Sequence, residues 1–162
     1  GCKNFTHVHN NHPEVATNGD QYDAAVKIHS PKDLLTLIKC QNNNLDPKDS
    51  FAVVISNEGI FALSITEKIN IDSNLNSNWQ KFVESYETES QFIVANPNFN
   101  SEERKKALQK LLLEKLKKLG LQDKLALFEG QVENKESNDF NLYNINWTRV
   151  TLERNKLERN PC

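Results

Sequence analysis

The 162-residue sequence contains no methionine and only five glycines. A chain without an initiator methionine is expected to be a processed form or an excised piece of a longer protein, and it shows no signal peptide. No apolar run approaches the roughly 18 residues that a membrane-spanning helix needs, so no membrane span is expected. The motifs of nucleotide-binding loops, of serine hydrolases and of H-E-x-x-H metalloproteases are also missing.

Cysteine is scarce, and the three residues present have spacings that fit no zinc knuckle and no C-x-x-C redox pair. Cys40 falls in an apolar helical pattern and is expected to be a buried thiol. Cys2 and Cys162 stand at the two ends and could pair in an exported protein. Gly1-Cys2 is compatible with a lipoprotein cleavage site that leaves a lipid anchor on Cys2, and equally with an arbitrary chain boundary.

The charge has no strong sign, because 20 basic residues are balanced by 22 acidic ones. Nucleic acid is therefore not expected as a partner, since binding to it needs a basic face. The basic residues between Arg104 and Lys118 lie in a leucine-rich pattern and are interpreted as the solvated face of a helix. An apolar share of 37% predicts a core that is compact but not large.

Periodicity along the chain predicts a single α+β domain over residues 1–155, followed by a frayed polar tail over 156–162. Asparagine-rich stretches such as 70–78 and the segment 10–22 are expected to form loops. The expected strands are 5–9, 51–56, 60–66, 125–132, 140–145 and 147–152, with a short extended stretch over 24–29, and the expected helices are 31–41, 78–88 and 101–119.

The most specific chemical feature is His7-Val8-His9 on the first predicted strand. Residues at i and i+2 of a strand point to the same face, so the two imidazoles are expected to lie together. Asp33, at the start of the following helix, could supply a third ligand. Three protein ligands with one open position are typical of catalytic zinc. His12 and His29 are interpreted as surface histidines.

A second interpretation needs no metal. Ser30, Pro31 and Asp33 are also an excellent helix start, in which serine caps, proline fits the first turn and aspartate complements the helix dipole. Two histidines on a strand are more often ordinary half-exposed side chains than ligands. The ordered combination of these residues, followed by a predicted hairpin, favours the metal site.

The order of H-x-H strand, Ser30-x-x-Asp33 helix start and hairpin resembles the JAMM metalloprotease motif of the JAB/MPN domain. The resemblance implies a JAB/MPN-like, cytidine-deaminase-like mixed sheet with flanking helices. It implies that His7, His9 and Asp33 bind zinc and that Ser30 stabilises the transition state, while an upstream glutamate activates the metal-bound water. The reaction would be hydrolysis of a peptide or isopeptide bond in a protein or peptide substrate.

The chain also resembles uncharacterised bacterial proteins, often with secreted or surface-linked relatives, over about residues 5–66 and more loosely from the Asn146-Trp147 region to Pro161-Cys162. This likeness favours an exported or cell-envelope location over a cytoplasmic one.

Three departures from the JAMM pattern bear on activity. Asn10 stands where the family has proline, the interval from His9 to Ser30 is longer, and residues 1–6 contain no acid that could act as the general base. Two hypotheses therefore remain open. The chain is a JAMM-like zinc hydrolase domain, truncated at its N-terminus or degenerate, or it is a non-catalytic binding or assembly module of an exported bacterial protein.

Overall fold

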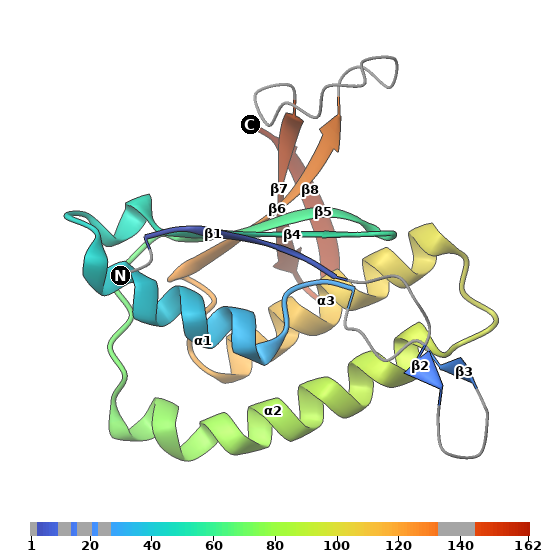
Figure 1. The fold of residues 1–162 in the computed structure, drawn as a ribbon, viewed down its shortest axis with the longest axis horizontal. Coiled ribbons are helices and arrows are strands. Elements are labelled where there is room, and N and C mark those ends of the chain that lie inside the picture. The colour runs from blue at the N-terminus through green and yellow to red at the C-terminus, as the bar shows by residue number, and fades with distance from the viewer. Residues whose placement is uncertain (1–2, 10–13, 16–20, 23–26, 133–144) are drawn as a thin grey trace.

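The computed structural model describes residues 3–9, 14–15, 21–22, 27–132 and 145–162. A six-stranded mixed sheet has the strand order β1-β4-β5-β6-β7-β8, and three α-helices lie on one side of it (Figure 1). The α+β class is thereby confirmed. The elements are β1 Phe5–Val8, β2 Glu14–Val15, β3 Gln21–Tyr22, α1 Pro31–Cys40, 3₁₀ turns Gln41–Asn43 and Pro47–Asp49, β4 Phe51–Ser56, β5 Gly59–Ile65, α2 Ser73–Val94, α3 Ser101–Lys118, β6 Leu125–Val132, β7 Ile145–Glu153 and β8 Lys156–Pro161.

Strand β1 is parallel to β4, and α1 lies between them in the sequence. This β-α-β connection is the only parallel pairing within the described sheet, whose other neighbours are antiparallel. The predicted hairpin of β4 and β5 is confirmed, and Gly59 takes a φ of 147° at its turn, a conformation that favours glycine. Strands β2 and β3 form a separate antiparallel pair inside the segment expected to be a loop.

The main core lies between the sheet and the helices. Alternate residues of the strands point toward the helices, and these strand residues meet the apolar faces of α1 and α3. Helix α2 packs on α1 and α3 and forms the outer layer (Figure 1). Side chains buried in this core include Leu34, Leu37, Phe61, Leu63, Tyr86, Leu112, Leu116 and Leu127.

Two elements differ from the sequence-based predictions. Helix α2 starts at Ser73, within the asparagine-rich stretch expected to be a loop, because the Asp72 side chain accepts a hydrogen bond from the Leu75 N–H and caps it. The tail expected to fray from Lys156 instead forms β8, which pairs with β7 from Glu153 to Thr148. Of the two stretches predicted over 24–29 and 140–145, residues 24–26 and 140–144 lie outside the described residues.

The cysteines also differ from expectation. Cys40 is fully buried as predicted, but it is disulfide-bonded and not a free thiol. Cys162 is free and exposed, so the alternative in which it pairs with Cys2 does not hold. Among the helices that the structure describes, none combines the length and apolarity that crossing a membrane requires.

Candidate metal centre

Strand β1 and the residue directly after it present His7 and His9 to the helix-covered side of the sheet. The backbone N–H of His9 donates to the carbonyl oxygen of Ile55 at 2.9 Å, which continues the pairing of β1 with β4 beyond the last strand residue. The ring centroids of His7 and His9 are 4.6 Å apart, as the i, i+2 spacing predicts. The His9 side chain is buried, whereas about half of the His7 side chain is exposed to solvent.

The start of α1 fixes the third side chain. Ser30 and Asp33 form a capping box, in which the Asp33 N–H donates to Ser30 Oγ at 3.2 Å and the Ser30 N–H donates to Asp33 Oδ2 at 2.8 Å. The Ser30 hydroxyl also donates to Asp33 Oδ2, at 2.7 Å. One carboxylate oxygen is therefore held by the helix start, and the orientation of the carboxylate is set by these bonds.

The three predicted ligands converge. His7 Nδ1 lies 2.8 Å from Asp33 Oδ1, His9 Nε2 lies 3.6 Å from Asp33 Oδ2, and one possible ligand atom from each residue falls within 4.8 Å of the others. Two ligand atoms at about 2.1 Å from one tetrahedral metal are roughly 3.4 Å apart. The 3.6 Å between His9 Nε2 and Asp33 Oδ2 is of this size, whereas the 2.8 Å between His7 Nδ1 and Asp33 Oδ1 is a hydrogen bond that a shared metal ion would replace. The group of His7, His9 and Asp33 could hold a metal ion.

An unpartnered buried atom supports this fit. His9 Nε2 is shielded from solvent and has no hydrogen-bond partner within the described residues, since 3.6 Å to Asp33 Oδ2 is too long for a hydrogen bond. Leaving a buried polar nitrogen without a partner costs about 1–3 kcal/mol. A metal ion bound between His9 and Asp33 would remove this cost.

Asp33 is held in its ionised form. Burial of this carboxyl raises its pKa, but the contacts from His9, from the Ser30 backbone N–H and from His7 outweigh burial and hold the pKa well below its usual range. A carboxylate that stays ionised near neutral pH is the form that binds a cation.

His29 lies next to this group and was not predicted to be buried. It is fully buried, its Nε2–H donates to the carbonyl oxygen of Ala52 at 2.9 Å, and its own carbonyl accepts from the Tyr86 hydroxyl at 2.8 Å. Burial lowers the pKa of His29 to about 4 and raises that of Tyr86 above its usual value. The prediction of a surface histidine is therefore wrong, and the only sequence signal against it is the position of His29 directly before the helix cap.

The other predicted site features stand as follows. Ser30 lies next to the group of His7, His9 and Asp33. Its hydroxyl donates to the Asp33 carboxylate and accepts from the Asp33 N–H, so it is already engaged in the helix cap. His12 lies outside the described residues. The metal-binding group found in the described part of the chain contains one carboxylate, that of Asp33, and no glutamate joins it.

Comparison of the chain with protein-family models, with curated proteins and with solved structures found no match.

Proposed function

We propose that this chain is a JAMM-like, zinc-dependent hydrolase domain that acts on a peptide or isopeptide bond, with His7, His9 and Asp33 as the metal ligands. The observation that carries the proposal is the convergence of these side chains from two separate elements, with His7 and Asp33 26 residues apart in sequence. The parallel β1-α1-β4 unit supports it, because it brings the H-x-H strand beside the Ser30-x-x-Asp33 helix start, as the resemblance implies.

The donor set favours zinc over harder cations. Two imidazole nitrogens and one carboxylate oxygen are typical of catalytic zinc, whereas calcium and magnesium select oxygen ligands. Three protein ligands leave a fourth position for water or substrate, and the exposed side of His7 is where this position would reach solvent. A bound zinc ion would polarise the substrate carbonyl and lower the pKa of a coordinated water.

The residues of the chain have separate tasks in this proposal. The Ser30 N–H keeps Asp33 Oδ2 in place, so that the carboxylate is oriented before metal arrives. The Ser30 hydroxyl could donate to the developing oxyanion of the substrate only by releasing Asp33 Oδ2, which the N–H bond would continue to hold. A proton-accepting carboxylate is the catalytic part that the described residues do not supply.

The first experiment measures zinc. The purified chain, stripped with a chelator and dialysed against zinc chloride, is expected to retain one zinc per molecule by elemental analysis. His7→Ala and Asp33→Asn should each lower the affinity at least about tenfold, because each removes a ligand. Asparagine can still accept from the Ser30 N–H, so the helix start is preserved. Lys32→Ala, an exposed neighbour on α1, is the matched control.

Zinc-loaded and zinc-free protein are then compared on fluorescein-labelled casein and on a glycyl-lysine isopeptide reporter. Zinc-dependent cleavage that His7→Ala abolishes would support the hydrolase. Tight zinc binding with no cleavage of either substrate would contradict catalysis and favour a binding or assembly module. No zinc retained by the folded chain would overturn the metal site itself.

A further inference from the structure

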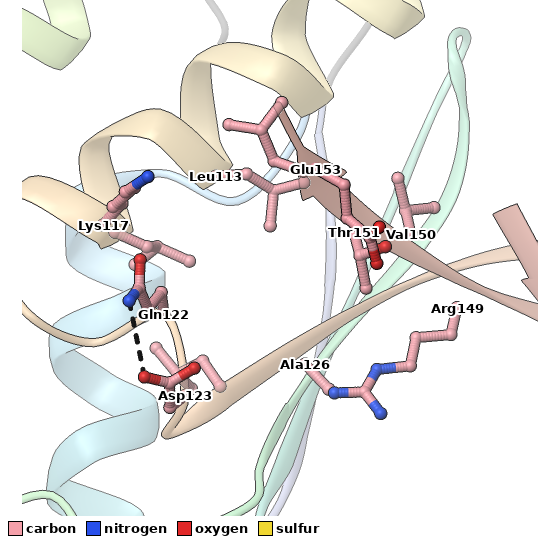
Figure 2. Close-up of a pocket in the computed structure, with 12 residues that line it drawn as sticks. Leu113, Lys117, Gln122, Asp123, Ala126, Arg149, Val150, Thr151 and Glu153 are labelled. Carbon is pink, nitrogen blue, oxygen red and sulfur yellow. Dashed lines mark hydrogen bonds between the residues drawn. The ribbon is translucent and has the colours of Figure 1, made fainter. Parts of the chain in front are cut away.

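A cleft opens where β6 and β7 separate. Their pairing ends at Leu127 opposite Val150, although both strands continue: β6 stays paired with β5 as far as Leu125, and β7 stays paired with β8 as far as Glu153. The sheet is therefore split at this end. A cleft of about 370 Å³ lies in the split, closed on one side by α3 (Figure 2).

Each of the two strands directs backbone N–H and C=O groups into the split. The Thr66 N–H donates to the Lys124 carbonyl, and the Cys162 N–H donates to the Trp147 carbonyl. In an antiparallel sheet the hydrogen-bonding direction alternates from residue to residue. Counting from these two bonds, the N–H and C=O of Leu125 point toward β7 and those of Leu152 point toward β6. These are the next positions in the ladder, and they lie beyond its last pair.

The side chains around the cleft are of two kinds. Leu113 and Leu116 of α3 and Val150 of β7 supply an apolar wall. Four charged residues of both signs also line it: Lys117, Asp123, Arg149 and Glu153 (Figure 2). None of the four forms an ion pair with any residue that the structure describes.

Thr151 adds a further unpartnered group. Its hydroxyl oxygen is inaccessible to solvent and has no hydrogen-bond partner in the described ranges, and the residue lines the cleft. A buried hydroxyl without a partner is unfavourable. A ligand with hydrogen-bonding groups along its length would satisfy it.

We propose that this cleft binds a short peptide segment in extended conformation, inserted between β6 and β7 as an added strand. Backbone groups of the peptide would bond to Leu125 and Leu152, an apolar side chain would face α3, and flanking side chains of opposite charge would meet Arg149 and Glu153. Addition of a strand to free sheet edges is a general mode of peptide recognition, in which the backbone provides affinity and alternate side chains provide specificity.

This site is separate from the metal group. His9 is bonded to Ile55, near the β4–β5 turn, whereas Leu125 is paired with Ile65, at the opposite end of β5. The proposal therefore does not depend on zinc or on hydrolysis, and it concerns a partner segment and not the bond that is cleaved.

The probe is the capped tripeptide N-acetyl-Glu-Leu-Lys-amide, titrated into the full ¹⁵N-labelled chain by NMR. The amide signals of Leu125 and Leu152 are expected to shift in a saturable manner. A second peptide with N-methyl-leucine has the same side chains but lacks one backbone donor. It should bind about tenfold more weakly, since one hydrogen bond contributes up to about 1.5 kcal/mol.

Leu113→Trp, which fills the cleft, should abolish binding, while Lys110→Ala, at an α3 position outside the cleft, should leave it unchanged. Equal binding of the two peptides would overturn the added strand, because only side chains would then be recognised. Shifts confined to residues outside the cleft, or none at all with the parent peptide, would overturn the site. The peptide pair keeps the proposal testable if Leu113→Trp does not fold.

Discussion

Asp33 serves two purposes with one carboxylate. Oδ2 accepts from the backbone and side chain of Ser30 and so completes the helix cap, while Oδ1 faces His7. Stability of the helix start and orientation of the candidate ligand are therefore linked through Ser30. A change at Ser30 should affect both.

At this residue, Ser30→Ala is expected to lower the free energy of unfolding of the zinc-free chain by about 1 kcal/mol, the usual cost of losing an N-cap. It should also weaken zinc binding by roughly 10- to 100-fold, as is common for residues that orient a metal ligand. Urea denaturation and competition with a fluorescent zinc chelator measure the two effects. Ser30→Thr should restore both, and an unchanged zinc affinity in Ser30→Ala would show that Ser30 does not orient Asp33.

At the scale of elements, α3 is fixed to the sheet by ion pairs as well as by its leucines. Lys105 Nζ lies 2.7 Å from Glu129 Oε1, and Gln109 Nε2 donates to Glu129 Oε2 at 2.9 Å. Burial raises the pKa of the Glu129 carboxyl, but the Lys105 ammonium, the Gln109 amide and Arg159 outweigh burial and keep that pKa below its usual value. The pair is nearly enclosed, so breaking one partner is costly.

We therefore expect Glu129→Gln to destabilise the protein by about 2 kcal/mol, because it removes the buried partner of Lys105 and leaves only the exposed Glu102 as its ion-pair partner. The double variant Glu129→Leu, Lys105→Leu should recover most of that loss, since neither charge is then buried. Glu114→Gln, which removes the solvent-exposed pair with Lys110, should cost less than about 1 kcal/mol and serves as the control. Thermal or urea unfolding of the three variants measures these losses. Equal losses of stability in Glu129→Gln and Glu114→Gln would show that the Glu129 ion pair does not fix α3 to the sheet.

At the scale of the whole molecule, the buried His29 makes stability depend on pH. Burial lowers its pKa to about 4, whereas an unfolded histidine titrates near 6.5. Between these values the unfolded chain takes up a proton that the folded chain excludes, so the free energy of unfolding falls as the pH drops from 6.5 to 4. The shift corresponds to about 3 kcal/mol.

Urea midpoints of the zinc-free chain at pH 7 and pH 4.5 test this. His29→Gln keeps an N–H donor for the Ala52 carbonyl but does not titrate, so most of the loss between the two pH values should disappear. A loss of the same size in His29→Gln would assign the acid sensitivity to other groups. Below the ordinary carboxyl range a further loss is expected from Asp33, whose folded-state pKa is depressed.

Local patterns predicted the elements whose signals lie within a few residues. Ser30, Pro31 and Asp33 start α1 as predicted, and the strand Leu125–Val132 has its predicted bounds. The H-x-H spacing and the helix start together also predicted the grouping of His7 and His9 with Asp33, because each element orients its own side chains.

Features that depend on distant packing were not predictable. Strand β8 is mostly polar and follows a turn in which Arg154 and Asn155 both have positive φ, without the asparagine-glycine pair that signals such turns. The burial of His29 depends on α2, whose Tyr86 is 57 residues away in sequence. The split between β6 and β7 has no local pattern at all, since both strands continue through it.

Helix α1 is held at both ends. Its first turn carries Asp33, which lies beside His7 and His9, and its last residue is the disulfide-bonded Cys40. Its ten residues span about 15 Å, so the candidate metal group and the disulfide constrain opposite ends of one short, rigid helix.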